Sequence, residues 1–252
     1  SMGASRRTPQ AAVMGRAKAA ATRWKYEYLL PILRTDGITQ MTLCVQYGCG
    51  FHAPPGWLNF DSSPTLRFER MPLLGLLYTK NASRFPAEVR YGDIVKGLPI
   101  GPGTADKLYA SHMLEHLAYE DAQRALANSY LVLRQGGVFR LIVPDLHARA
   151  ERYLRQVGNP NSAPEFLDST LLGYRRRPSG TLGVLSALFG GSQHLWMWDE
   201  ASLTDALQRA GFAGIRRCTF GDSQDEQFAL VEKMDRFVDN EIVELAMECI
   251  KP

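Results

Sequence analysis

Short apolar runs that alternate with helical patterns are the feature that most restricts the fold of this chain. Between the last two of five such runs, residues 119–137 carry apolar residues at helical spacing and end at Gly136 and Gly137. Each run is short enough to be a buried strand: TLCVQYG (42–48), WLNFD (57–61), EVRYGD (88–93), KLYAS (107–111) and VFRLIVPD (138–145). Alternating strands and helices predict a parallel sheet that is covered on both faces.

The alternation continues near the end of the chain. The stretch DEASLTDALQRAGF predicts a helix that begins at Asp199 or Ser202 and ends at Gly211. Two further strand candidates follow, GIRRCTF (214–220) and VELAMECIK (243–251), and we expect the second to run antiparallel at or near the sheet edge. In such sheets ligands bind beyond the carboxyl ends of the strands.

Charge and composition vary along the 252 residues. The first 30 residues hold six basic side chains and one acid, so this segment is +5 and the remaining 222 residues sum to −2. We expect a basic helical extension over 1–36, with a transit peptide as the alternative, and a main domain over 37–252. A polar stretch rich in glycine and proline predicts a lid or acceptor insertion over 158–198. The near-neutral main domain excludes the broad basic face that nucleic acids require.

The four cysteines are scattered and form no CxxC pair, which is typical of a reducing compartment. No apolar stretch approaches the ~18 residues of a membrane span, and we expect no secretory signal because nothing near the start has its apolar core. We therefore expect a cytoplasmic protein, either a monomer or a homodimer.

The segment YGCGFHAPPGWLNFD (47–61) joins the first two predicted strands. Gly48 and the five residues after it satisfy the letters of the GxGxxG/A dinucleotide pattern. However, a proline pair breaks any helix there, and only eight residues separate the two runs, which is too few for a crossover helix. A P-loop is excluded because no Gly-Lys-Ser/Thr follows. What remains is a glycine turn that faces Asp61, which is either a ribose-binding carboxylate or a surface aspartate beside a tight turn.

Five motifs follow in order from about residue 42 to 146: LCVQYGCG, WLNFD, YGDIVKGLPI, LYASHMLEHL and VLRQGGVFRLIVPD. This series, which resumes at LTDALQRAGFAGIRR, resembles class I S-adenosylmethionine-dependent methyltransferases, in particular the methyltransferase type 11-like group. The resemblance implies an α/β fold, a Rossmann-like doubly wound sheet of about seven strands, mostly parallel with one antiparallel strand. It also implies S-adenosylmethionine as the cofactor.

The resemblance assigns roles to several residues at the strand ends. The backbone at Gly48 and Gly50 would approach the methionine part of the cofactor, and Asp61 would hold the ribose. The adenine edge would meet Asp93 and Ile94. The full set of expected cofactor-binding residues is Tyr47, Gly48, Cys49, Gly50, Asp61, Asp93, Ile94, Ser111 and His112.

One departure from the family pattern affects the cofactor's carboxylate. Family members usually have an acidic or hydrophobic residue before the first glycine pair and a longer first helix, whereas this chain has Tyr47 and the proline pair. How the carboxylate of the methionine part is bound therefore stays open.

The stretch HMLEH (112–116) matches the letters of the inverted zinc-protease motif HxxEH. Histidines four apart on a helix share a face and can hold zinc. A catalytic zinc also needs a third protein ligand, which the sequence does not nominate. We therefore expect no metal, with Ser111 and His112 near the transferable methyl and with His116 and Leu117 turned toward the structure.

Methyl transfer from a sulfonium is an in-line displacement that gains most from a dry site holding the acceptor close to the methyl. A hydroxyl acceptor also needs a base with a pKa near neutrality. The expected catalytic residues are His112, Asp145 and His194. The expected acceptor-binding residues are His147, Arg175, Arg176, Trp196 and Trp198. For the histidines a structural role, and for the arginines a solvated surface, are the competing interpretations.

The leading hypothesis is therefore a methyltransferase that acts on a hydroxyl of a small molecule or glycan, with no nucleic acid as a partner. An NAD(P)-dependent Rossmann oxidoreductase or epimerase is disfavoured by the missing long first helix and by the absence of a Tyr-x-x-x-Lys pair. A catalytically silent cofactor-binding scaffold is the third alternative.

Overall fold

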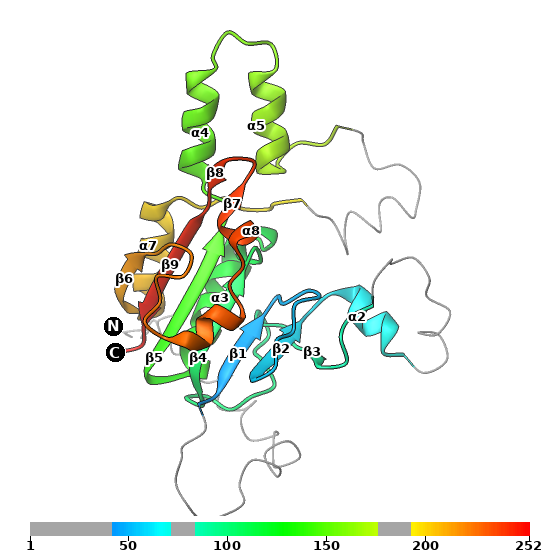
Figure 1. The fold of residues 1–252 in the computed structure, drawn as a ribbon, viewed down its shortest axis with the longest axis vertical. Coiled ribbons are helices and arrows are strands. Elements are labelled where there is room, and N and C mark those ends of the chain that lie inside the picture. Colours follow the sequence, from blue (N-terminus) through cyan, green and yellow to red (C-terminus); the bar gives the residue numbers. More distant parts are fainter. Residues whose placement is uncertain (1–41, 72–83, 176–192) are drawn as a thin grey trace, which may run out of the picture. The chain divides into compact units, whose positions relative to one another are not determined.

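The computed structural model describes residues 42–71, 84–175 and 193–252. Within them a seven-stranded sheet has the order β3-β2-β1-β4-β5-β9-β6 (Figure 1). Its strands are β1 (Cys44–Tyr47), β2 (Trp57–Asp61), β3 (Val89–Tyr91), β4 (Ala105–Ser111), β5 (Leu133–Val143), β6 (Ala213–Arg217) and β9 (Leu245–Ile250). All neighbours are parallel except that β9 is antiparallel to both β5 and β6. The expected fold is confirmed.

The strand order reverses at β1. This strand pairs in parallel with β2 on one side and with β4 on the other, and all four of its residues are buried. Between β1 and β2, residues 48–56 form only a turn and no helix, as the short spacing predicts. A reversal of strand order leaves a crevice beyond the carboxyl ends of the strands. The glycine turn that follows β1 therefore opens onto this crevice.

The last strand is antiparallel and lies near the sheet edge, as expected, where it is the second strand from the edge. Strand β9 lies between β5 and β6, and Leu245, Ala246 and Met247 are all buried. Consecutive buried residues need cover on both faces of the sheet, which only an interior strand receives. The edge position belongs to β6, whose Arg216 and Arg217 are exposed, and charged side chains are typical of protected sheet edges.

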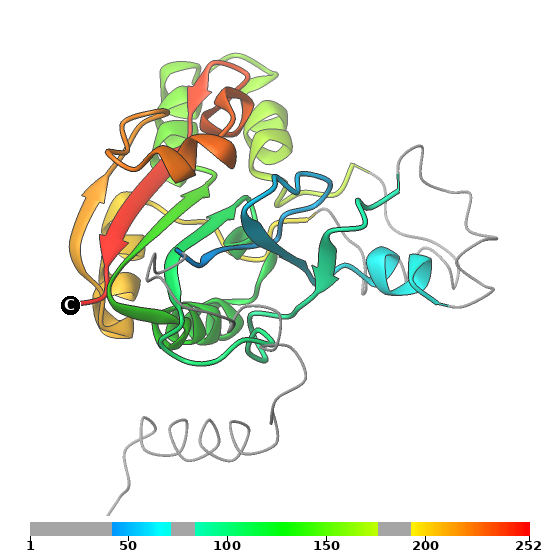
Figure 2. The same cartoon turned by 60° about the horizontal axis from the view of Figure 1, so that its bottom comes forward.

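Helices α3 (Tyr119–Val132) and α7 (Glu200–Ala210) cover one face of the sheet (Figure 2). Helix α7 begins with a capping box in which Asp199 and Ser202 exchange side-chain and backbone hydrogen bonds, and it ends at Gly211 in the left-handed conformation. Both ends agree with the sequence prediction. Between the two helices and the sheet lies the larger hydrophobic core cluster.

Helix α3 is shorter than predicted. It ends at Val132, and Leu133 already pairs with Ala105 of β4. The backbones of Gly136 and Gly137 are hydrogen-bonded to Lys251 at the end of the sheet. The two glycines therefore lie in strand β5 and do not terminate the helix.

The opposite face of the sheet is covered by the segment between β6 and β9, residues 218–237, which we call the cover segment (Figure 2). It contains η3 (Glu226–Leu230) and α8 (Met234–Phe237), and a hairpin of β7 (Val238–Asp239) and β8 (Ile242–Val243) follows. Its residues Phe228, Val231 and Phe237 pack against Trp57 and Tyr109 of the sheet. The cover segment thus occupies part of the face that a helix after β1 would otherwise cover.

A buried ion pair anchors the cover segment to the sheet. The guanidinium of Arg140 on β5 donates to Glu232 at 2.7 Å, and both side chains are 1% exposed. The same guanidinium also reaches Glu248 at 2.6 Å and Asp222 at 2.9 Å. A buried charge of this kind is tolerated only when it is paired.

The chain between β5 and α7 projects as a pair of helices, α4 (Leu146–Arg155) and α5 (Ser162–Thr170) (Figure 1). Of the two, only α5 lies within the expected 158–198 insertion, whose residues 176–192 lie outside the described residues, as does the expected extension 1–36. Helix α2 (Pro64–Glu69) follows β2. Among the described helices, none combines the length and apolar character needed to cross a membrane.

Replacing the buried arginine should destabilise the domain. In Arg140→Met the Glu232 carboxylate loses its partner, and we expect the free energy of unfolding to fall by about 3–5 kcal/mol. Urea unfolding measures this. Arg134→Met, which removes the half-exposed partner of Asp106, is the control and should cost no more than about 1 kcal/mol. An equal loss of unfolding free energy in the two variants would refute the role of the Arg140–Glu232 pair as an anchor.

Candidate functional site

The glycine turn and the end of β2 are joined through Asp61. The backbone N–H of Gly50 donates to Asp61 Oδ2 at 2.9 Å, and the N–H of Ser63 donates to Oδ1 at 2.7 Å. Asp61 is 8% exposed, so its carboxylate is not turned out to solvent. A carboxylate offers about four acceptor positions, of which two are used. Two positions therefore remain for hydroxyl groups of a ligand.

The positions of Gly48 and Gly50 in the turn each favour glycine, but their surroundings differ. Gly48 and Gly50 both have positive φ, 65° and 54°, which disfavours other residues. A Cβ on Gly48 would lie 2.7 Å from Met113 Cγ, whereas a Cβ on Gly50 would meet nothing within 4 Å. Gly48 thus allows close packing inside the protein, and Gly50 borders open space that a ligand can approach.

Two expected cofactor residues of this turn place their side chains in the core instead. Tyr47 is 1% exposed, and its hydroxyl lies 3.0 Å from Ser129 Oγ on α3. Cys49 packs with Leu66 and Phe85, and burial raises the pKa of its thiol to about 12. Only the backbone of these two residues is available to a ligand at the turn.

The turn after β3 contains Asp93 and Ile94. Asp93 Oδ1 accepts from the N–H of Val95 and Oδ2 pairs with Lys96, so this carboxylate shapes the turn. Ile94 is 4% exposed and belongs to the core. The assignment of both residues to the adenine stays a prediction.

The end of β4 brings Ser111 and His112 to the crevice. The hydroxyl of Ser111 is buried and makes no well-aligned hydrogen bond within the described chain. His112 has φ 51°, and its Nε2 lies 2.9 Å from the carbonyl oxygen of Arg236 on α8. Burial by itself lowers the pKa of His112, but the Glu115 carboxylate and the Arg236 carbonyl outweigh it and raise the pKa above its usual value.

The cover segment lies over the crevice at the strand ends, which the sequence did not predict. The cavity between the cover segment and the strand ends measures only about 30 Å³, and Val231, Lys233 and Arg236 form its wall on the cover side. The wall on the sheet side comprises Gln46, Gly48, Cys49, His52, Tyr109 and Ser111. Ligand pockets usually measure ~300–1,000 Å³, so this cavity holds little more than water. No local pattern marks Lys233 or Arg236, because both lie far from the glycine turn in sequence.

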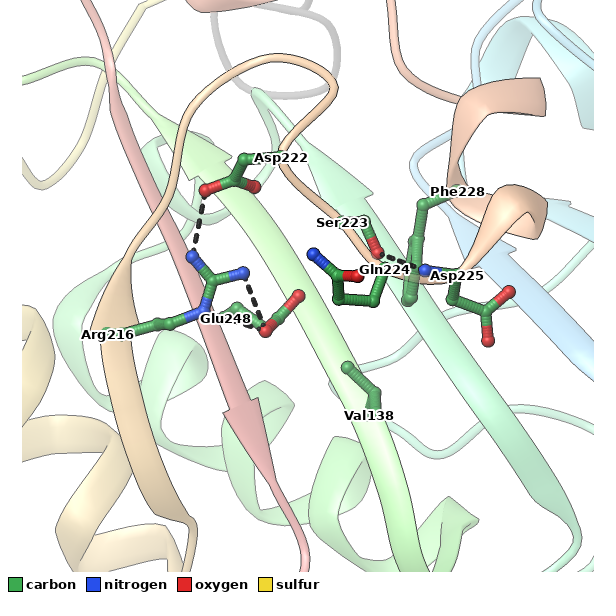
Figure 3. A pocket seen from close by; sticks show the side chains of 8 residues that line it. All are labelled: Val138, Arg216, Asp222, Ser223, Gln224, Asp225, Phe228 and Glu248. Atoms are coloured by element: carbon green, nitrogen blue, oxygen red, sulfur yellow. Dashed lines mark hydrogen bonds and ion pairs between the residues drawn. The ribbon is translucent and has the colours of Figure 1, made fainter.

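A larger cavity, about 390 Å³, lies elsewhere, on the face of the sheet over β5, β9 and β6 (Figure 3). Arg216 spans it by pairing with Asp222 at 2.8 Å and with Glu248 at 2.9 Å. Since these charges already satisfy one another, this cavity offers little to a charged ligand.

The expectation that Asp145 is a general base is not supported by its surroundings. It is 2% exposed, and its Oδ1 caps α4 by accepting from the N–H groups of His147 and Ala148. Its Oδ2 pairs with Arg217 at 2.8 Å. A carboxylate held in this way is structural, so we do not retain Asp145 as a catalytic candidate.

The expected acceptor residues separate into different environments. The His147 side chain is 70% exposed on α4, and the exposed Arg175 is paired with Asp168. Arg176 lies outside the described residues. Trp198 is fully buried in the core, so the expectation that it lines an acceptor pocket is wrong. Trp196 is 42% exposed, and its ring lies 4.7 Å from that of Tyr119.

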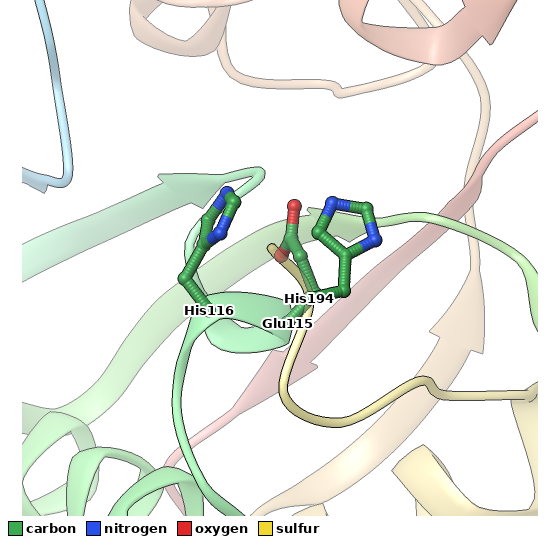
Figure 4. A group of neighbouring side chains, drawn as sticks. All are labelled: Glu115, His116 and His194. Atoms are coloured by element: carbon green, nitrogen blue, oxygen red, sulfur yellow. The ribbon is translucent and has the colours of Figure 1, made fainter. Parts of the chain in front are cut away.

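His194 lies beside the HMLEH stretch, about 80 residues away in sequence. Leu114–His116 form the single turn η2, and the rings of His116 and His194 are 5.1 Å apart (Figure 4). Burial lowers the pKa of His194, which is 9% exposed. In Figure 4 the Glu115 carboxylate is seen between the two rings, and one ligand atom from each of the three residues lies within 4.8 Å of the others.

Alanine at the two turn glycines should separate packing from backbone strain. Both variants carry the strain of positive φ, about 1–2 kcal/mol, but only Gly48→Ala also collides with Met113. We expect Gly48→Ala to unfold at the lower temperature. Thermal unfolding followed by circular dichroism measures this, and equal losses in the two variants would contradict the packing role of Gly48.

Residues 71–141 match the family described as "Methyltransferase domain". The matched segment contains Asp93, Ser111 and His112 and begins after the glycine turn and Asp61. No curated protein matches the chain.

The solved structures that this chain matches include three methyltransferases. A possible histamine N-methyltransferase from Thermotoga maritima is 14% identical, with a TM-score of 0.43 over 96% of this chain and 97% of that one. A methyltransferase from Archaeoglobus fulgidus is 11% identical, with a TM-score of 0.43 over 97% and 100%. One from Mesorhizobium loti is 18% identical, with a TM-score of 0.40 over 88% and 95%.

These TM-scores are too low to carry information on activity. The assignment depends instead on the family match and on the sheet order, in which the strands reverse at β1 and the last strand is inserted antiparallel. Both features agree with the series of five motifs between about residues 42 and 146. Residues 71–141 therefore resemble a methyltransferase domain, and the sheet around them has the fold that the motif series implies.

Proposed function

We propose that this protein transfers a methyl group from S-adenosylmethionine to a hydroxyl of a small molecule or glycan. The observation that carries the proposal is the position of Asp61, which is held by Gly50 and Ser63 with two acceptor positions left over. A carboxylate at the end of the second strand suits the two hydroxyls of a ribose. When bound, the cofactor supplies an electrophilic methyl group on its sulfonium.

The chemistry of the crevice fits the rest of the cofactor. The open space at Gly50 allows close backbone approach, and the buried Ser111 hydroxyl lacks a well-aligned partner. Lys233 and Arg236 place two cationic side chains at the cavity wall. These cations suit the carboxylate of the methionine part, for which the sequence offers no ligand.

The space between these groups does not fit the cofactor in this arrangement. A cavity of about 30 Å³ is roughly a tenth of the smallest usual ligand pocket. Binding therefore requires the cover segment to move away from the strand ends around Val231 and Arg236. The contacts that hold it there include His112 Nε2 with the Arg236 carbonyl and His52 Nε2 with the Leu230 carbonyl.

The exposed Trp196 and the half-buried Tyr119 beside it support a sugar as the acceptor. Trp196 and Tyr119 present adjacent rings, and apolar faces of sugar rings pack well on aromatic surfaces. Next to them, the buried Nδ1 of His194 has no hydrogen-bond partner within the described chain. A neutral imidazole nitrogen of this kind can accept the proton of a hydroxyl during transfer.

Two alternatives predict different ligands. A dinucleotide-dependent oxidoreductase needs a helix after β1 to face the pyrophosphate, and residues 48–56 form none. A catalytically silent scaffold would bind the cofactor without turnover. Calorimetry with S-adenosylhomocysteine and NAD, followed by an acceptor screen with sugars, separates the three. Binding of NAD alone would refute the proposal, and cofactor binding without turnover on any acceptor would favour the scaffold.

Removing the Asp61 carboxylate should weaken cofactor binding. We expect Asp61→Ala to lose about 1–3 kcal/mol of S-adenosylhomocysteine affinity through the lost ribose contacts. Asp61 also holds the turn, so loss of structure must be controlled for. Asp61→Asn, which keeps one acceptor oxygen, is one control, and an unfolding measurement on each variant is the other. Asp205→Asn removes an exposed carboxylate on α7 and should bind normally. Unchanged calorimetric affinity in folded Asp61→Ala would refute the assignment.

The two cations of the cover segment should contribute to the same affinity. We expect Lys233→Ala and Arg236→Ala each to weaken binding of S-adenosylhomocysteine about 3- to 30-fold, through loss of a charge-assisted contact with its carboxylate. Binding of 5′-methylthioadenosine, which lacks that carboxylate, should not change in either variant. Arg155→Ala, an exposed arginine on α4, is the matched control. Equal losses for both ligands would contradict a carboxylate-binding role.

A further inference from the structure

We propose that Glu115, His116 and His194 form a binding site for a divalent transition-metal ion. Each residue offers one ligand atom, and these atoms all lie within 4.8 Å of one another (Figure 4). The HMLEH sequence by itself predicts no metal, because it nominates no third protein ligand. The fold supplies that ligand from the segment before α7. Two imidazoles and one carboxylate form a common donor set for zinc and for non-haem iron.

The surroundings of the Glu115 carboxylate are the strongest indication that this site binds a positive ion. It is fully buried, and neither of its oxygens accepts a well-aligned hydrogen bond from the described residues. The nearest basic group is His112, whose Nδ1 lies 3.4 Å from Oε1. Because an ionised carboxylate is costly to bury without donors or a cation, the site favours a positive ion.

The two histidines are prepared to act as ligands. Nδ1 of His116 lies 3.1 Å from the carbonyl oxygen of Gln193, which can only accept, so this nitrogen carries the proton. The lone pair is then on Nε2. Nδ1 of His194 is buried and unpaired within the described part of the chain. Metal-binding histidines are commonly oriented through a backbone carbonyl at the second ring nitrogen, as His116 is here.

Backbone contacts hold the two halves of the site together. The carbonyl oxygen of Glu115 accepts from the N–H groups of Leu195 at 2.7 Å and Trp196 at 3.2 Å. The N–H of His194 is in turn hydrogen-bonded to the Leu171 carbonyl. The segment that carries His194 is therefore attached to η2 by main-chain bonds, so the ligands approach each other independently of any ion.

The donor types select among ions. Mg²⁺ and Ca²⁺ prefer oxygen ligands throughout, whereas imidazole nitrogen suits Zn²⁺ and its neighbours. With bonds of ~2.0–2.2 Å, a tetrahedral zinc ion holds its donors roughly 3.4 Å apart, so the side chains would close by about 1.4 Å at most. Three protein ligands also leave a position for water or a substrate oxygen. An acceptor hydroxyl at that position rests on the proposed function, whereas binding of the ion does not. With the ion bound, His194 Nδ1 is a ligand and no longer a proton acceptor.

The test is a metal titration of the full-length, untagged protein, freed of metal by a chelator and kept in a thiol-free reductant. We expect Zn²⁺ to bind with a stoichiometry of one, with Co²⁺ giving visible absorption bands and Mg²⁺ showing no competition. Loss of one ligand in His116→Ala or His194→Ala should weaken Zn²⁺ binding at least ~10-fold. His147→Ala, which removes the exposed histidine of α4, should bind as the wild type does.

Glu115→Gln keeps the volume of the side chain and removes its charge, so it tests the site if an alanine variant fails to fold. Calorimetry with S-adenosylhomocysteine on the same variants separates this proposal from the proposed function. Absence of Zn²⁺ binding to the wild type would overturn the metal site. So would Zn²⁺ binding of unchanged affinity in folded His116→Ala and His194→Ala, or in folded Glu115→Gln if neither alanine variant folds.

Discussion

Cover of the sheet face beside β1 is the constraint on which the arrangement of this domain depends. Eight residues between the first two strand runs are too few for a helix, so the apolar face formed by Trp57 and Tyr109 needs another partner. The segment between β6 and β9 provides Phe228 and Phe237 for this purpose. Its attachment through the buried Arg140–Glu232 pair then brings α8 over the strand ends.

The position of the cover segment affects ligand binding in the crevice. A cover segment that packs on the sheet also narrows the crevice at the point where the strand order reverses, which explains why the cavity there is small. The same segment carries Lys233 and Arg236, two cations that the crevice otherwise lacks. Stability and ligand access are therefore coupled, because the contacts that complete the core are next to those that a bound cofactor would replace.

Two groups of polar residues lie beyond the carboxyl ends of β2 and β4, the strands on either side of β1. Asp61 at the end of β2 is satisfied by backbone donors and keeps acceptor capacity. Glu115, just after β4, is buried without such donors, and two imidazoles surround it. The difference has a physical meaning. A carboxylate that holds a turn needs only backbone donors, whereas a buried carboxylate among histidines is stabilised by a cation.

Much of this protein follows from local sequence. Apolar runs of strand length, the absence of a helix before β2 and the ends of α7 at Asp199 and Gly211 were all predicted correctly, because each depends on neighbouring residues. Two of the predicted cofactor and acceptor residues, Tyr47 and Trp198, have fully buried side chains instead. Tyr47 and Trp198 are large apolar side chains in the right stretches, but burial in the core satisfies them better than a ligand does.

The sequence by itself determined the alternation of strands and helices that gives a mostly parallel sheet, and a glycine turn followed by an aspartate at the end of the next strand. Only the tertiary structure decided that β9 lies inside the sheet, that Asp145 caps a helix and pairs with Arg217, and that His194 meets Glu115 and His116. The physical reason is distance along the chain. Periodicity and caps act over a few residues, whereas pairing of buried charges and convergence of ligands depend on how distant segments pack.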